Sequence, residues 1–167
     1  MKIIRLILIL SGTTVIAWLF GSQIMVLNKV RTEGQTVYLD LRPVDPRALM
    51  LGDYMRLRYT EERVPDGMSL DDLPPKGAFT MSLDENNVAR VSGVDLSRER
   101  ETNEIRFNYT RTNRSLTFGA PRFYFENGKA ETYENAKYGV FKVSPAGKTI
   151  LVNLADEEFQ ILRPRSD

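Results

Sequence analysis

Residues 138–154 read YGVFKVSPAGKTILVNL, and this stretch decides the fold class of the chain. Two apolar segments flank the sequence Ser144-Pro145-Ala146-Gly147. Proline and glycine favour tight turns, whereas the segments on either side are rich in the β-branched and aromatic residues that favour strands. The stretch therefore predicts an antiparallel β-hairpin.

The chain on the N-terminal side of this hairpin alternates between apolar and polar residues. Val37, Leu39 and Leu41, for example, are separated by polar or amphipathic residues. Alternation with a period of two is typical of half-buried strands. Further strands are expected near residues 37–41, 55–59, 79–83, 88–91, 105–109 and 116–118. Residues 129–137 are a candidate short helix, and Phe159, Ile161 and Leu162 are expected to close the domain.

The first 27 residues, MKIIRLILILSGTTVIAWLFGSQIMVL, differ from the rest. Residues 6–24 carry no charge, and ~19 helical residues at ~1.5 Å each nearly span a hydrocarbon core of ~30 Å. A signal peptide cleaved after Ala17 is the alternative, but cleavage there would leave an apolar new terminus that begins at Trp18. We therefore predict an uncleaved transmembrane helix.

Local charge gives little information on the orientation of this helix. Lys2 and Arg5 precede it, and Lys29 and Arg31 follow it, so the positive-inside rule is nearly balanced. Because a short tail before such an anchor usually stays inside, we place the remainder outside the cytoplasm. The expected organisation is a cytoplasmic tip and anchor at 1–27, a linker at 28–34, a β-rich domain at 35–163 and a tail at 164–167. The predicted fold is thus mainly β, with antiparallel sheets or a partly open barrel, one N-terminal transmembrane helix and one short helix.

Composition narrows the chemistry that this domain can perform. The chain has 23 basic and 22 acidic residues, so it lacks the basic excess of a dedicated nucleic-acid-binding protein. It has no cysteine and no histidine. Disulfides, thiolate metal sites and the commonest general base are therefore excluded. We expect no metal, no cofactor and no nucleic-acid partner, and the residue types argue against an enzyme.

Residues 43–59 read PVDPRALMLGDYMRLRY and contain the most distinctive motif in the chain. Gly52 and Asp53 predict a turn, because glycine permits positive φ and aspartate accepts backbone N–H bonds. Tyr54, Leu57 and Tyr59 then begin a strand. By parity Tyr54 and Tyr59 lie on opposite faces, so that one packs and the other is exposed.

This motif closely resembles the GDYXXLXY protein family, which is named for the residues that stand here as Gly52, Asp53, Tyr54, Leu57 and Tyr59. The preceding family positions are Pro43, Asp45, Pro46 and Arg47. A second block resembles a later family motif and contains Phe118, Gly119, Phe123, Tyr124, Phe125, Glu126 and Gly128. The family tends to have a proline-glutamate-glycine turn in that block, whereas this chain has Glu126-Asn127-Gly128 without the proline.

The resemblance covers nearly the whole chain and implies a bacterial membrane-anchored protein. Members are often encoded beside polytopic membrane proteins, so the resemblance implies a single-pass protein of the inner membrane with a polytopic partner. It also implies that the C-terminal domain faces the periplasm or the cell exterior. It does not imply a reaction. Our leading hypothesis is a non-enzymatic envelope module that binds such a partner.

Two alternatives remain open. An exported hydrolase could use the carboxylates of Asp45 and Asp53, although we interpret these groups as ion-pair partners of Arg47 and Arg58. The domain also resembles type I signal peptidases loosely, with Lys76 in the place of the base. No serine nucleophile lies between residues 35 and 66, so that likeness implies a shared fold without the chemistry.

Overall fold

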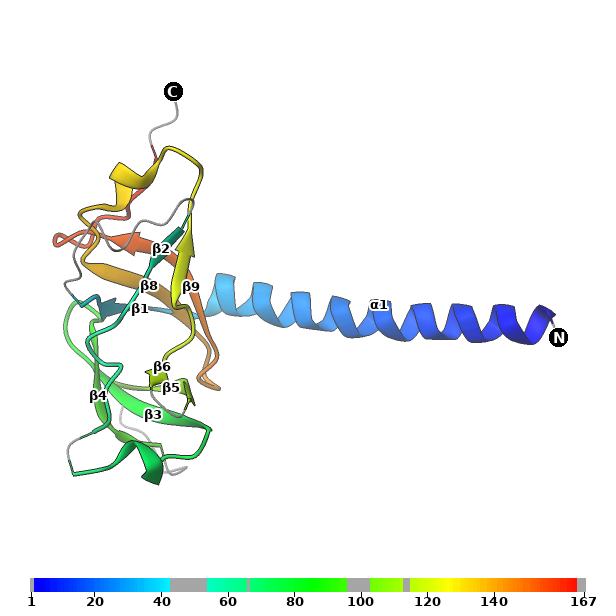
Figure 1. Ribbon diagram of the computed structural model, residues 1–167, viewed down its shortest axis with the longest axis horizontal. Coiled ribbons are helices and arrows are strands. Elements are labelled where there is room, and N and C mark those ends of the chain that lie inside the picture. Colours follow the sequence, from blue (N-terminus) through cyan, green and yellow to red (C-terminus); the bar gives the residue numbers. More distant parts are fainter. Residues whose placement is uncertain (1, 43–53, 66, 96–102, 113–114, 165–167) are drawn as a thin grey trace.

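A computed structural model describes residues 2–42, 54–65, 67–95, 103–112 and 115–164. One long helix, α1 (Lys2–Glu33), projects from a domain built of short strands (Figure 1). The strands are β1 (Gln35–Asp40), β2 (Tyr54–Arg56), β3 (Lys76–Leu83), β4 (Ala89–Val94), β5 (Glu104–Arg111), β6 (Leu116–Thr117), β7 (Arg122–Tyr124), β8 (Tyr138–Val143) and β9 (Thr149–Ala155). Two 3-10 turns, η1 (Leu70–Asp72) and η2 (Ala130–Tyr133), complete the elements.

Helix α1 is long and apolar enough to cross a membrane, and none of its most apolar 18-residue window is buried against the domain. Its hydroxyl side chains do not leave unpaired polar groups, because Thr13, Thr14 and Ser22 each donate to a carbonyl of the preceding turn at 2.8 Å. The helix continues to Glu33, across most of the segment 28–34 that we assign to a linker.

The end of α1 is seated on the β domain. Val30 is buried there, and the amide of Gly34 donates to the carbonyl of Val30 at 2.9 Å. Any Cβ at Gly34 would clash with that carbonyl and would lie 3.1 Å from the amide nitrogen of Val143 in β8. Glycine thus allows the chain to turn directly from the helix into β1.

The strands form three antiparallel sheets, in the orders β1-β8-β9, β2-β7 and β4-β3-β5-β6. The hairpin predicted at 138–154 is β8 and β9, joined by a turn in which Gly147 has a φ of 80°. Every region in which we expect a strand contains one, although the strand near 55–59 is limited to β2. The candidate helix at 129–137 is only the 3-10 turn η2, whose Tyr133 is buried.

Backbone hydrogen bonds join the sheets to one another. The amide of Tyr38 in β1 donates to Asn87, before β4, and the amide of Asn108 in β5 donates to Gly147, in the β8–β9 turn. The amide of Thr60, beyond β2, donates to Asp40. These links wrap the sheets around one interior, and the predicted mainly β fold with antiparallel sheets and a partly open barrel is confirmed.

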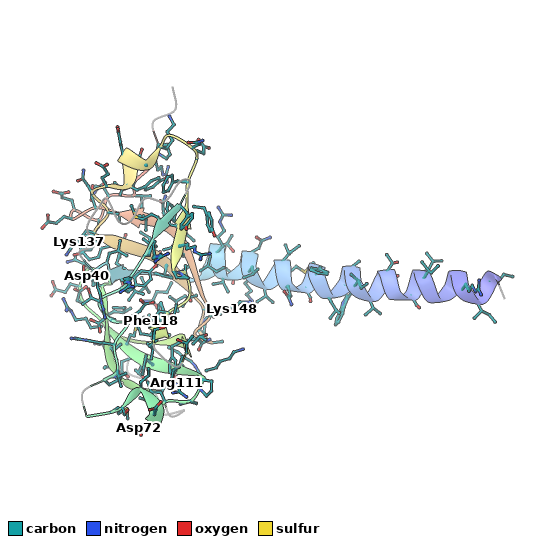
Figure 2. All side chains as sticks on the ribbon, in the orientation of Figure 1. Asp40, Asp72, Arg111, Phe118, Lys137 and Lys148 are labelled. Atoms are coloured by element: carbon teal, nitrogen blue, oxygen red, sulfur yellow. The ribbon has the colours of Figure 1, made fainter. Side chains whose placement is uncertain are left out.

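Aromatic side chains from all parts of the domain fill that interior. Phe107 contacts Phe118 and Phe141 edge to face, with ring centroids 5.5 and 5.6 Å apart. Tyr59 contacts Phe141 at 5.4 Å, and Phe79 contacts Phe118 at 5.8 Å. Figure 2 shows Phe118 in the middle of the domain. Edge-to-face pairs of this kind stabilise a core beyond the area they bury.

Candidate binding surface

The structure pairs the two sequence motifs with each other. Strand β2 belongs to the first motif and β7 to the second, and they are antiparallel neighbours. Tyr54 lies directly opposite Tyr124, and Arg56 lies opposite Arg122. A further backbone bond runs from the amide of Leu57 to the carbonyl of Pro121 at 2.9 Å. Segments more than 60 residues apart in sequence thus form one unit.

One face of this two-stranded sheet packs inward. Met55 is buried, and the ring centroid of its partner Phe123 lies 5.0 Å from that of Tyr133. Phe125 also packs on Tyr133, at 5.5 Å. Strand β7 and the 3-10 turn that follows it therefore share an aromatic contact, which positions the second motif.

The opposite face carries two tyrosines and two arginines, and we call it the motif face: Tyr54, Arg56, Arg122 and Tyr124. Tyr124 is 66% exposed, and both arginines are exposed. The rings of the two tyrosines are 5.7 Å apart, and the guanidinium of Arg122 lies 5.4 Å from the centroid of the Tyr54 ring. An arginine above an aromatic face is held by a cation–π interaction.

The last tyrosine of the first motif lies in the core instead. Tyr59 is fully buried, and its hydroxyl donates to the carbonyl of Ala120 at 3.0 Å. Burial raises the pKa of Tyr59 far above its ordinary range, and the nearby charge of Glu62 adds to this effect. The phenol is therefore neutral at any physiological pH and acts as a fixed donor. Of the two tyrosines, Tyr59 packs as one of the pair was expected to, whereas Tyr54 is half-buried and not fully exposed.

Two glutamates that follow Tyr59 attach the first motif to its neighbours. Glu61 is buried and accepts from the amide of Val91 in β4 at 3.0 Å. Glu62 accepts from the amides of Tyr59 and Phe118 at 3.3 and 3.2 Å. Burial raises the pKa of Glu62, although these amides and the charges of two nearby arginines oppose the shift.

A cleft of about 400 Å³ opens beside the motif face, and we call it the arginine cleft. Its lining is Arg42, Arg56, Leu57, Arg58, Glu62, Ser115, Leu116, Thr117 and Pro121. Three separate segments supply these residues: the end of β1, the strand β2 with its extension, and β6 with the residues around it. Arg56 belongs to both the cleft and the motif face, so the two are continuous.

The remaining residues of the second motif shape the loops around β7. Gly119 has a φ of 116° and Gly128 a φ of 78°, values that favour glycine. The amide of Lys129 donates to the carbonyl of Glu126, which closes the turn that contains Gly128. The turn therefore forms without the family's proline.

Several motif residues lie outside the described part of the chain. They are Pro43, Asp45, Pro46, Arg47, Gly52 and Asp53. The proposed convergence of the carboxylates of Asp45 and Asp53 therefore stays a prediction. Among the described residues, no group of three or more acidic, histidine or cysteine side chains is placed to hold a metal ion.

Sequence reasoning missed the residues that connect the motifs. Glu62, Ser115, Thr117 and Arg122 carry no local signal of function, because their roles depend on which strands become neighbours. Arg42 and Arg56 could have been found as exposed arginines that alternate with core residues. What the sequence could not indicate is that β2 would pair with β7.

Comparison with known proteins identifies a family for this chain. No curated protein and no solved structure matches the chain. A family model described as GDYXXLXY protein matches residues 16–154. The match begins within α1 and extends into β9, so it includes both motifs and most of the chain. This protein therefore belongs to the GDYXXLXY protein family.

Proposed function

We propose that this protein is a binding module anchored in the bacterial inner membrane, which engages a polytopic membrane protein through its motif face outside the cytoplasm. The observation that carries the proposal is the exposure of Arg56, Arg122 and Tyr124, beside the half-buried Tyr54, at the point where the two family motifs meet. Tyrosine and arginine are the residue types enriched at protein interfaces and at their energetic centres.

The path of α1 supports a retained anchor. The helix runs without interruption through Ala17 and Trp18, the alternative cleavage position, and ends on the β domain at Val30. Cleavage would leave half of an apolar helix attached to that domain. Retention keeps the domain within a turn or two of the membrane surface, where a polytopic protein presents its loops.

One side of the helix also suits a helical partner. Thr13, Ala17 and Gly21 follow one another at intervals of four residues, and a Cβ at Gly21 would meet nothing within 4 Å. Small residues at this spacing let two transmembrane helices approach closely. The anchor could thus contribute to partner binding as well as to localisation.

Fractionation tests the anchor and its orientation. We expect alkaline carbonate to leave the full-length chain in the membrane pellet, and protease added to spheroplasts to degrade the β domain. Release into the carbonate supernatant would contradict anchoring. Protection from protease in intact spheroplasts, with digestion after lysis, would contradict the proposed orientation.

Site-specific photocrosslinking tests the motif face. A photoreactive residue in place of Tyr124 is expected to capture a polytopic membrane protein at native expression. The matched control places the same residue at Glu85, which is exposed in the turn before β4. Equal capture from both positions, or none from Tyr124, would contradict a specific role of the motif face.

The hydrolase hypothesis rests on Asp45 and Asp53 and has its own test. If these carboxylates perform acid–base chemistry, Asp45→Asn and Asp53→Asn fail to complement a deletion strain while the protein still accumulates. Full complementation by both variants excludes the hydrolase.

A further inference from the structure

The arginine cleft brings three cationic side chains to one opening. Arg42 follows β1, Arg56 ends β2, and Arg58 lies on the extension of β2. The amide of Arg42 donates to the carbonyl of Arg58 at 2.9 Å, so the two residues are held side by side by the backbone. The hydroxyl-bearing residues Ser115 and Thr117 also line the cleft.

Two of these arginines, Arg42 and Arg58, lie near Glu62. The guanidinium of Arg42 donates to the backbone carbonyl of Glu62 at 3.2 Å. Both Arg42 and Arg58 lie near enough to the Glu62 carboxyl to favour its charged form. The oxygens of that carboxyl already accept from the amides of Tyr59 and Phe118. The Glu62 carboxylate thus accepts hydrogen bonds from the backbone and offsets only part of the positive charge of the cleft.

No carboxylate of the described residues forms an ion pair with the three arginines. The ion pairs in these parts of the chain involve Lys29, Arg106, Arg111 and Lys137 instead. Lys137, for example, is paired with Asp40 at 3.2 Å (Figure 2). Among the described residues that line the cleft, three guanidinium groups and one partly engaged carboxylate give a net positive charge.

We infer that the arginine cleft binds a phosphoryl group, with Arg42, Arg56 and Arg58 as its cationic ligands and Ser115 and Thr117 as neutral donors. A carboxylate is satisfied by one arginine through two parallel hydrogen bonds. A phosphoryl group offers more acceptor oxygens and up to two charges, which suits several guanidinium groups that approach from different strands. The open volume of about 400 Å³ also leaves room for the group that carries the phosphate.

Titration of the purified full-length protein with inorganic phosphate tests the site. The protein is held in a neutral detergent, and binding is measured by calorimetry at constant ionic strength. Arg56→Gln and Arg58→Gln are each expected to weaken binding roughly tenfold, since each removes a charge-assisted hydrogen bond. The matched control is Arg90→Gln, an exposed arginine on β4, which should leave binding unchanged. Equal losses in all three variants would reveal only general charge attraction and overturn the site.

Glu62→Gln provides a test in the opposite direction. Removal of the one described negative charge in the cleft should tighten phosphate binding several-fold, whereas a merely structural arginine cluster would bind no phosphate before or after the change. Acetate serves as the carboxylate probe. If acetate binds as tightly as phosphate, the assignment to a phosphoryl group is wrong.

Two further arms identify the source of the phosphoryl group. In nanodiscs of phosphatidylglycerol, a lipid headgroup in the cleft would compete with inorganic phosphate and lower its apparent affinity relative to phosphatidylcholine nanodiscs. Unchanged affinity points to a soluble phosphate ester. These measurements need no partner protein, so they can fail while the proposed function stands. Loss of partner crosslinking in Arg58→Gln without any phosphate binding by the native protein would assign the cleft to the partner instead.

Discussion

Tyr54 and Tyr59 show how five positions of sequence separate a surface residue from a core residue. Both belong to the first motif, yet Tyr54 stacks beneath Arg122 on the motif face whereas Tyr59 is fully buried. The difference follows from strand parity, which directs alternate side chains to opposite faces. Residue identity alone therefore does not indicate whether a family tyrosine binds or packs.

Tyr59→Phe isolates the buried hydrogen bond from the packing of the ring. Loss of the bond to the Ala120 carbonyl is expected to lower the free energy of unfolding by about 1 kcal/mol, because the ring remains and only the hydroxyl is removed. Urea unfolding followed by near-UV circular dichroism measures this, since all seven tyrosines lie in the β domain and Trp18 lies in α1. Tyr124→Phe is the control, and an equal loss there would contradict a specific role of the buried hydroxyl.

Glu62 makes stability depend on pH in a defined direction. Its pKa is raised from the ordinary value of 4.5 by burial, so the folded state holds the proton more tightly than the unfolded state. The stability contributed by this proton is complete below pH 4.5 and is lost as pH rises through the raised pKa. As pH rises over that range, the native protein should therefore lose unfolding free energy relative to the Glu62→Gln variant. A constant difference across the range would contradict the raised pKa.

At the scale of elements, the junction between α1 and β1 has the least tolerance for change. The helix ends beside β8, and Gly34 lies between the carbonyl of Val30 and the backbone of Val143. Backbone atoms surround it on both sides, so a larger residue cannot be accommodated by a side-chain rotation. The orientation of the domain relative to α1 is thus constrained at Gly34.

Gly34→Ala is expected to destabilise the domain by roughly 1–3 kcal/mol, because either the helix end or β8 must move. Gly93→Ala in β4 is the matched control, since a Cβ there meets nothing within 4 Å and alanine reduces the entropy of the unfolded chain. Urea unfolding of the two variants measures the difference. Equal stability of the two would show that the junction can relax.

The two motifs depend on each other structurally through the pairing of β2 with β7. Each strand is only three residues long, and neither would be stable alone. Met55 and Phe123, at the centres of the two strands, attach the pair to the core, and the residues that flank them form the motif face on the opposite side. The motif face therefore requires both blocks of sequence.

At the scale of the whole molecule, the three sheets share one aromatic core. Phe107 of β5 contacts Phe141 of β8, and Phe118 joins the same cluster. We expect the sheets to unfold together, since none of them encloses a core of its own. The backbone hydrogen bonds between the sheets support the same behaviour.

Phe141→Leu tests this cooperativity. The substitution is expected to cost roughly 1–3 kcal/mol by removing ring contacts in the core. Hydrogen exchange should report the same loss of protection for the amides of β3 and β5 as for those of β8 and β9. A loss confined to β8 and β9 would indicate that the sheets are independent units.

Local pattern was sufficient for most of the architecture. The hairpin at 138–154, the alternating strands and the long apolar helix were all predictable, because side-chain periodicity and turn chemistry act over a few residues. The family motif was also visible as a linear stretch. The candidate helix at 129–137 is present only as the 3-10 turn η2, in which Tyr133 packs against Phe123 and Phe125.

The order of strands within the sheets depended on tertiary contacts. Nothing in the first motif indicates that Tyr54 will lie opposite Tyr124, or that Arg42, Arg58 and Thr117 will line one cleft. Such proximity arises only when distant segments bury their apolar faces against a common core, and a strand of three residues has too little pattern to specify its partner. Periodicity therefore determined which segments became strands, and burial around one aromatic core determined which of them became neighbours.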